Sequence, residues 1–367
     1  MCMFSKWERV FLSCLLVGSL AVAGCGGGKK DADKGGKTKI AFVHNGSIND
    51  GGWTNAHSNG RLALLKDNKN VEAAYVENVG DGADAERVIT QLASQGNKVI
   101  FATSFGYMDA MVNVAKKYPD TIFMHCSGYK TASNMGNYFG RIYQARYLTG
   151  MVAGKQTQSN IIGYVAAFPI PEVVRGIDAF TLGVKAVNPK AIVKVIWSNT
   201  WYDPAKEKQA ALTLIDAGAD VITQHQDTVG PQLAAEERGK WSIGYNMDMS
   251  KAAPKAVLTS AIWNWGPYYE KVVKEVQAGT WKSGAYWGSM KDNVVDIAPY
   301  GPMVPETTRT LVNQAKQDII SGKLDPFAGP IKDQDGKVRV EQGQVLSDAD
   351  LLKIDWFVEG VDGYISK

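Results

Sequence analysis

Short apolar runs alternate with helical repeats along most of the chain. The apolar run at 40–43 is followed by a polar, glycine-rich turn at 45–52, and apolar residues then recur at helical spacing from Trp53 onward. This order predicts a strand, a loop and a helix, the first unit of a parallel α/β sheet. In such sheets ligands bind beyond the carboxyl ends of the strands, close to helix N-termini.

The same unit recurs through the first part of the chain. Helices are expected to begin near Asp84 and Asp109 and to end before Gly96 and Pro119, because Gly favours a helix end and Pro cannot continue a helix. Consecutive units of this kind predict right-handed parallel crossovers and a doubly wound sheet. The strands expected after the first lie at 73–76, 98–102 and 121–124.

A second series of units follows. Pro171 and Pro204 suit the first turns of two further helices, and Asp203 is a capping residue for the second of them. The C-terminal part adds a helix at 306–321 and a hairpin across 333–336. The strands expected in this series lie at 161–165, 191–197, 221–223, 241–245 and 257–262. The loops after these strands are rich in aromatic residues, Asp, Asn and Gln, which suits a binding cleft between two lobes.

The composition is that of an ordinary soluble globular protein. The chain has 367 residues, of which 45% are hydrophobic and 21% charged, and this length suits about two domains. The formal net charge is only +3, and the basic residues are scattered. The charge pattern therefore gives no indication of a nucleic-acid partner.

The N-terminal stretch differs from the rest of the chain. Lys6 and Arg9 precede a short apolar stretch at 11–24, which ends in small residues directly before Cys25. The stretch is shorter than the ~20 residues that span a bilayer and has the form of a secretory signal. The final residues resemble a bacterial lipoprotein lipobox, which implies a signal peptide at 1–24 and lipidation of Cys25. The alternative is an ordinary signal peptide in which the Cys occurs by chance.

The cysteine count fits an exported and anchored protein. Cys2 and Cys14 leave with the signal peptide, and Cys25 becomes the anchor, so that only Cys126 remains and no intramolecular disulfide can form. Cys126 follows an apolar run and is expected to be a small buried side chain. Residues 25–39, rich in Gly and Lys, are expected to form a flexible tether.

Several short segments carry a further signal as a set. They are 46–54 (GSINDGGWT), 84–87 (DAER), 103–106 (TSFG), 203–206 (DPAK), 244–248 (GYNMD) and 258–260 (LTS). Together they resemble the basic membrane protein family, the substrate-binding lipoproteins of ABC transporters, over nearly all of 38–360.

That resemblance implies an α/β chain with the type I periplasmic-binding-protein fold, in which two doubly wound parallel-sheet lobes are joined by a three-strand hinge. The expected lobes are 40–140 with about 258–290 for lobe 1, and about 141–257 with about 291–365 for lobe 2. The expected crossings lie near 139–159, near 254–264 and within 285–305.

The resemblance also implies a function. Characterised members of the family bind purine nucleosides or purine bases. We therefore expect a monomeric, lipid-anchored, extracytoplasmic binding protein that delivers a purine to an ABC permease. No cofactor, metal site or catalytic residue is expected.

Family binding residues carry over at particular positions. In the first loop the family has an Asp and then an aromatic residue followed by Asn, which Asp50 and Trp53-Thr54 match here; Asp248 matches an Asp of the second lobe. Family members that bind nucleosides also have a Lys shortly after a Thr-Ser pair, where it contacts the ribose. Here Trp263 and Asn264 stand in that region, which favours a free base, adenine foremost, over a nucleoside.

The residues support this chemistry independently. A purine is a flat π-system with donors and acceptors on its rim, and Trp53, Phe105 and Trp201 are candidate stacking platforms. Asp50 or Asp248 could accept hydrogen bonds from the base, and Asn264 could pair with its edge. The candidate ligand-binding residues are Asp50, Trp53, Thr54, Ser104, Phe105, Gly106, Trp201, Gln226, Asp248, Trp263 and Asn264.

Alternatives remain for several of these residues. Asp50 could serve only to cap the first helix, and Phe105 could face the core. Trp263 could also face the core, with a sugar held instead by Gln226 or Asp227. His225 and Asp227 fit either a polar cleft or a surface loop.

Two other classes of function compete with transport. A purine nucleosidase would need catalytic groups, but the sequence has four His and contains no Gly-x-Ser-x-Gly, Walker, Cys-x-x-Cys or His-Glu-x-x-His motif. A ligand-sensing receptor lobe that controls a membrane partner would use the same fold and the same cleft.

Overall fold

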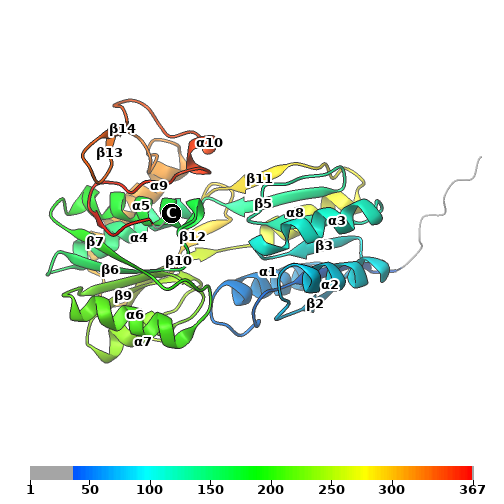
Figure 1. The fold of residues 1–367 in the computed structure, drawn as a ribbon, viewed down its shortest axis with the longest axis horizontal. Helices are drawn as coiled ribbons and strands as arrows, with labels where there is room; N and C mark the ends of the chain where they lie inside the picture. Colours follow the sequence, from blue (N-terminus) through cyan, green and yellow to red (C-terminus); the bar gives the residue numbers. More distant parts are fainter. Residues whose placement is uncertain (1–35, 366–367) are drawn as a thin grey trace, which may run out of the picture. The chain divides into compact units, whose positions relative to one another are not determined.

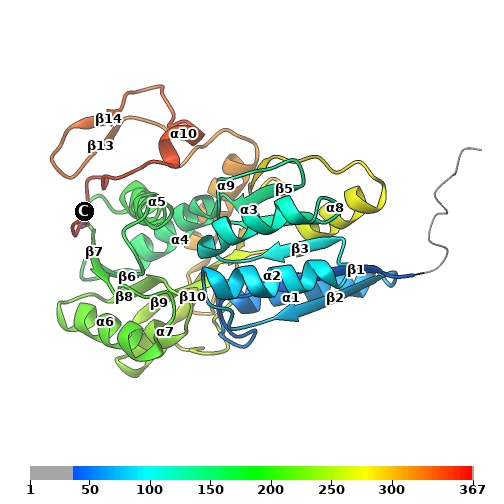
Figure 2. The same cartoon turned by 45° about the vertical axis from the view of Figure 1, so that its right-hand side comes forward.

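The computed structural model describes residues 36–365. In this part of the chain the strands form two mainly parallel sheets that are covered by helices (Figures 1 and 2). The expected α/β fold with two parallel-sheet lobes is therefore confirmed. The expected signal peptide at 1–24, the expected lipidation site Cys25 and most of the expected tether lie outside the described residues.

The first sheet has the strand order β11-β5-β4-β3-β1-β2, with every pair parallel. Its central strands, β1 and β3, are almost continuously buried, as in a parallel sheet that is covered on both faces. Its strands are β1 (Thr38–Val43), β2 (Val71–Val76), β3 (Val99–Ala102), β4 (Ile122–Cys126), β5 (Met135–Gly140) and β11 (Ala285–Gly288).

Two pairs of helices cover this sheet. α1 packs against α8 on one face, and α2 packs against α3 on the other. Cys126, at the end of β4, is fully buried and unbridged, as expected. The helices of this lobe are α1 (Trp53–Asp67), α2 (Ala83–Ser94), the short 3-10 helix η1 (Phe105–Tyr107), α3 (Met108–Lys117) and α8 (Gly266–Gln277).

The second sheet has the order β12-β10-β9-β8-β6-β7-β15. Only β12 is antiparallel to its neighbour among the described strands of this sheet. The strands are β6 (Ile161–Ala166), β7 (Ile192–Trp197), β8 (Val221–His225), β9 (Trp241–Asn246), β10 (Val257–Trp263), β12 (Val295–Ile297) and β15 (Val361–Asp362).

The helices of the second lobe also lie on both faces. α4, α5 and α9 contribute to one apolar core, and α6 and α7 to another. The α6 helix begins as expected, because Asp203 accepts a hydrogen bond from the Lys206 amide at 3.0 Å and Pro204 stands in the first turn. The helices are α4 (Ile142–Gln156), α5 (Pro171–Val187), α6 (Pro204–Asp216), α7 (Gly230–Glu237) and α9 (Glu306–Ile320).

A C-terminal segment follows α9 and lies beside α5 and β7 (Figure 1). It contains the hairpin strands β13 (Ile331–Lys332) and β14 (Val338–Val340) and the short helix α10 (Asp348–Leu351). Its last strand, β15, joins the edge of the second sheet, and the Asp178 carboxylate of α5 accepts the Val358 amide at 3.0 Å. The segment is thereby fixed to the second lobe.

The chain passes between the two sheets at three places: after β5, after β10 and between β11 and β12. One expected boundary differs from the structure. The expected lobe 1 includes about 258–290, yet β10 pairs with β9 and β12 of the second sheet. The chain returns to the first lobe only at α8. The sequence does not specify the partner of β10, because an apolar strand of this kind fits the centre of either sheet.

Several strand ends have backbone in the left-handed region. Ser127 directly follows β4, Asn199 lies in the loop after β7, and Asn246 is the last residue of β9. Their φ angles are 62°, 55° and 69°, respectively. Residues other than Gly adopt this conformation at a cost, and such residues cluster at functional sites. They turn the chain sharply at the carboxyl ends of both sheets, where the cleft lies.

Candidate ligand-binding site

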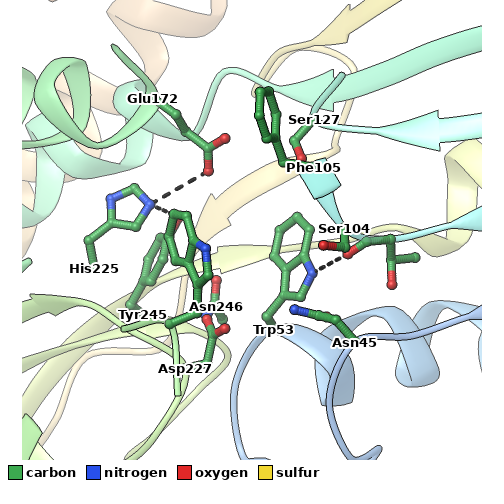
Figure 3. A pocket seen from close by; sticks show the side chains of 12 residues that line it. Asn45, Trp53, Ser104, Phe105, Ser127, Glu172, His225, Asp227, Tyr245 and Asn246 are labelled. Atoms are coloured by element: carbon green, nitrogen blue, oxygen red, sulfur yellow. Dashed lines mark hydrogen bonds and ion pairs between the residues drawn. The ribbon is translucent and has the colours of Figure 1, made fainter. Parts of the chain in front are cut away.

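A cavity of about 40 Å³ lies between the carboxyl ends of the two sheets. Both lobes supply its walls, and aromatic rings alternate there with carboxyl, amide and hydroxyl groups (Figure 3). Its lining residues are Asn45, Trp53, Thr103, Ser104, Phe105, Ser127, Glu172, Trp201, His225, Asp227, Tyr245 and Asn246.

Trp53 lines the cavity from the first lobe, and several contacts hold its side chain in place. Its indole N–H donates to the Thr103 carbonyl at 2.6 Å, and its ring meets His57 and Trp263 edge-on, with centroids 4.3 and 5.7 Å apart. These contacts fix the plane of the indole. Phe105 stands beside it on the short helix after β3 and is 46% exposed, so its ring is available at the rim of the cavity.

The second lobe supplies the opposing aromatic wall. Trp201, in the loop after β7, packs against Phe168 with centroids 5.3 Å apart. Tyr245, on β9, is fixed from behind by Arg146 of α4, whose guanidinium lies 3.7 Å from the ring centroid. Arg146 is fully buried, and its guanidinium nitrogens have no hydrogen-bond partner among the described residues, so this cation–π contact is its main interaction there.

Glu172 and His225 lie together on the second-lobe side (Figure 3). Glu172 is in the first turn of α5, and its Oε1 lies 3.7 Å from His225 Nε2. The same imidazole nitrogen is hydrogen-bonded to the Tyr245 hydroxyl at 3.0 Å. Burial lowers the pKa of His225 to about 4, although Glu172 opposes the shift, so the imidazole is neutral at neutral pH.

Asp227 is held by a chain of side-chain hydrogen bonds. The Asn246 amide donates to Asp227 Oδ1 at 3.0 Å, and the Trp263 indole N–H donates to the Asn246 carbonyl oxygen at 2.8 Å. Burial raises the pKa of Asp227 well above its usual range, and the nearby carboxyls of Asp50 and Glu207 raise it further. The Asp227 carboxyl therefore lies among hydrogen-bonding groups at the edge of the cavity, where a ligand can reach it.

The two lobes touch at the edge of the cavity. A Cβ added to Gly52 would lie only 2.3 Å from the Asp227 carbonyl oxygen. The loop before α1 therefore contacts the loop after β8 so closely that only Gly fits at this position. The structure thus has a closed cleft.

Four of the sequence-predicted site residues line this cavity: Trp53, Ser104, Phe105 and Trp201. Trp53 and Trp201 come from different lobes and face the same cavity, as expected of stacking platforms on either side of a thin ligand. The exposure of Phe105 also shows that its ring does not face the core.

Asp50 and Thr54 lie behind the cavity wall. The Asp50 carboxylate accepts the backbone N–H groups of Gly52, Thr54 and Asn55 at 2.8, 2.8 and 3.0 Å, so the capping alternative describes its contacts. Thr54 is buried beside it. Gly106 also does not line the cavity; it leaves room for the Asp81 carboxylate, which lies 2.2 Å from where a Cβ would be.

Four other predicted residues are also outside the lining. Asp248 is exposed and accepts the Ser250 amide at 2.9 Å. Gln226 is buried and donates to the Ser198 hydroxyl. Trp263 stacks on Trp265 with centroids 4.8 Å apart, and Asn264 donates to the Asn293 carbonyl at 3.0 Å. Trp263 therefore supports the site through Asn246 instead of filling the volume of a sugar.

Sequence reasoning overlooked or left open most of the polar lining. His225 and Asp227 had been left between cleft and surface, and the structure buries both in the cleft. Asn246 belonged to a recognised segment, but Asp248 was chosen from it. Asn246 reaches the cavity because β9 ends there in the left-handed conformation, and the sequence alone does not locate that strand end. The lining residues not singled out were Asn45, Thr103, Ser127, Glu172 and Tyr245.

Comparison with known proteins gives consistent matches. Residues 37–325 match the family model described as ABC transporter substrate-binding protein PnrA-like. A purine-binding protein of Brucella abortus is 46% identical over 92% of this chain and 95% of its own length. A putative ABC transporter glucose-binding protein of Haloferax volcanii is 41% identical over 93% of this chain and 83% of its own length.

Solved structures match at the level of the fold. The solute-binding protein of an ABC transporter system from Conexibacter woesei is similar with a TM-score of 0.65 and 24% identity, over 78% of this chain and 98% of that chain. Within residues 36–365, none of the helices has the length and apolar character needed to cross a membrane.

Proposed function

The chain belongs to the PnrA-like ABC transporter substrate-binding proteins, and from this premise we propose that it binds a purine base, adenine foremost, in the cleft between its two sheets. Binding proteins of this kind carry a small molecule to a membrane permease. The permease partner, a lipid anchor at Cys25 and an extracytoplasmic location are parts of the same proposal.

The observation that carries the proposal is the aromatic slot itself. Trp53 and Phe105 from one lobe and Trp201 from the other border one small cavity. Stacking on an aromatic ring contributes about 1–3 kcal/mol per base. The rim carries carboxyl, amide and imidazole groups, which match a flat heterocycle that has donors and acceptors around its edge.

The size of the cavity does not by itself distinguish a base from a nucleoside. The cavity of about 40 Å³ has room for only a few water molecules, so either ligand requires the lobes to adjust around it. The argument from Trp263 no longer applies, since that side chain lies behind Asn246. The preference for a base now depends on the polar groups of the rim.

The relatives suggest both the ligand and its competitor. The Brucella abortus protein is described as purine-binding and the Haloferax volcanii protein as glucose-binding. Aromatic rings can also pack against sugars. However, two aromatic walls on opposite sides of the slot are better matched by a planar ligand, which presents a π-face to each.

The most informative experiment is mass spectrometry of small molecules released when the purified protein is denatured. Adenine or another free purine is the expected product. A released hexose would overturn the purine assignment, and a released nucleoside would overturn the preference for a free base. Incubation with inosine and adenosine tests the enzymatic alternative, because liberation of free base would contradict a transport function.

The anchor can be tested separately. Cys25→Ala protein is expected to leave the membrane fraction, since lipid chains supply the attachment. If the mature variant still fractionates with membranes, the lipobox interpretation is wrong. Genes for a permease and an ATPase next to the coding sequence would favour transport over a receptor function.

A further inference from the structure

Glu172 is a carboxylate of the cavity lining whose hydrogen-bonding capacity is unused. Among the described residues its one ion-pair contact is with His225, and the distance of 3.7 Å between Oε1 and Nε2 exceeds a hydrogen-bond length. Its side chain is 16% exposed, and the carboxylate faces the cavity (Figure 3). Ionised carboxylates only accept hydrogen bonds, so this group has room for an N–H donor from a ligand.

The residues around Glu172 leave that role open. The Tyr245 hydroxyl already bonds the imidazole nitrogen that faces Glu172. Arg146 lies behind the Tyr245 ring and does not reach the carboxylate. Arg175, one turn further along α5, has its guanidinium 5.1 Å from the centroid of the Trp287 ring. Burial lowers the Arg175 pKa and the charge of Glu172 opposes that shift, but the two side chains form no ion pair within 4.0 Å among the described residues. No cation therefore pairs with Glu172 at close range among the described residues, while the start of α5 favours a negative charge.

The rest of the polar rim lies elsewhere in the cavity. Figure 3 shows Glu172 on one side of the slot and Asp227 and Asn45 on the other. Asn45 lines the cavity, and its amide oxygen has no hydrogen-bond partner among the described residues. An amide can both donate and accept, which suits the edge of adenine where an amino group and a ring nitrogen are adjacent. A base paired there would extend its imidazole ring across the slot toward Glu172.

We propose that Glu172 is the residue that selects a free base over a nucleoside, by accepting the imidazole N–H that a nucleoside has lost. The inference deepens the proposed function and rests on it. In adenosine the glycosidic nitrogen carries a sugar and has no hydrogen. A ligand without that hydrogen would enclose the carboxylate and leave it unpaired, and an enclosed unpaired polar group costs about 1–3 kcal/mol, or more when it is charged.

A cycle of ligand and protein changes tests this role. Calorimetry compares adenine with 9-methyladenine, which has a methyl group in place of the N–H, in wild type, Glu172→Gln and Glu172→Leu. Wild type is expected to bind adenine at least about tenfold more tightly than 9-methyladenine. The ratio is expected to shrink in Glu172→Gln and to disappear in Glu172→Leu, because the cycle isolates the pairwise interaction.

The matched control is Glu341→Gln, which removes a negative charge from an exposed position of the C-terminal segment and is expected to leave the ratio unchanged. Equal losses of both ligands in the Glu172 variants would overturn the selective role and leave purine binding intact. An unchanged ratio in those variants would do the same. If wild type binds neither adenine nor 9-methyladenine, the proposed function itself fails.

Discussion

Trp53 connects the loop of the first lobe to the cavity. Its N–H is bound by the Thr103 carbonyl, and its edges are held by neighbouring rings, so the indole reaches the ligand with little freedom left to lose. A side chain fixed in this way loses little conformational entropy when a base stacks on it. The same argument applies to Tyr245, whose ring is in contact with the Arg146 guanidinium.

Replacing Trp53 by Ala is expected to weaken purine binding about tenfold or more, because one stacked ring contributes about 1–3 kcal/mol. Trp53→Phe should lose less, since it keeps a π-face and loses only the bond to Thr103. Tyr364→Ala, at a position that is 74% exposed, is the control. Calorimetric affinities that are equal for wild type and Trp53→Ala would contradict a stacking role.

Buried carboxyls give the folded protein a characteristic pH dependence. Burial raises the pKa of Glu207 to about 7, against the hydrogen bonds that it accepts from Thr228 and Asp203. Burial also raises the pKa of Asp227 and Asp178 well above their usual range. These carboxyls hold protons that the unfolded chain releases, so their contribution to the free energy of unfolding falls as pH rises from about 4.5. The buried histidines, whose pKa burial lowers, contribute with the opposite sign up to about pH 6.5.

For Glu207 the expected loss is on the order of 3 kcal/mol between about pH 4.5 and pH 8, at about 1.4 kcal/mol per pKa unit. In Glu207→Gln that contribution is absent while the histidines are unchanged, so the unfolding free energy of the variant should rise relative to that of wild type over the same range. Urea unfolding at pH 5, 6, 7 and 8 measures the slope. Parallel pH profiles for wild type and variant would contradict the assignment.

At the scale of elements, the C-terminal segment connects to the first crossing between the lobes. Arg141, between β5 and α4, donates two hydrogen bonds to the Asp348 carboxylate of α10 at 2.6 and 2.7 Å. Its guanidinium also lies 4.4 Å from the centroid of the Trp287 ring of β11. One side chain thus links the helix α10 to two of the three crossing points.

Asp348→Asn is expected to lower the free energy of unfolding by about 0.5–1 kcal/mol, the range of a well-oriented but partly exposed ion pair. The difference between wild type and variant should shrink in high salt, because salt screens exposed charges. Chemical denaturation at low and high salt measures both effects. A loss that does not change with salt would indicate a packing defect instead of a broken ion pair.

The elements of this fold were largely predictable, because apolar runs and helix caps are local signals. The capping pair Asp203-Pro204 begins α6 where the sequence indicated. The pairing of strands that are distant in the sequence could not be predicted. Examples are the pair of β5 with β11 and the place of β10 in the second sheet. Trp53, Phe105 and Trp201 could be predicted as site residues, because each is an aromatic residue in a loop that follows a strand. Glu172 and Tyr245 required the register of α5 and β9, which tertiary packing decides.

At the scale of the whole molecule, the structure joins the two lobes through a contact that only Gly permits. Gly52 lies against the Asp227 backbone, beside the cavity that Trp53 and Trp201 border from the two lobes. Closure of lobes around a ligand assembles a site that is incomplete in the open form. The contact between these two loops should therefore be necessary for tight binding.

Gly52→Ala is expected to keep the protein folded and to hold the lobes apart, because the added Cβ would lie 2.3 Å from the Asp227 carbonyl oxygen. Purine affinity should fall by at least about tenfold if stacking from both lobes is lost. Gly284→Ala, where a Cβ would meet nothing within 4 Å, is the matched control. Small-angle scattering should show that adenine reduces the radius of gyration of wild type but not of Gly52→Ala. A variant that closes normally would refute this role of the contact.

The central claim is that the closed cleft binds a free purine base. Calorimetric titration of the purified protein with adenine, adenosine and glucose tests it most directly. Adenine is expected to bind with one-to-one stoichiometry and more tightly than adenosine, and glucose to give no binding heat. Tighter binding of adenosine than of adenine, or saturable binding of glucose in place of either, would contradict it.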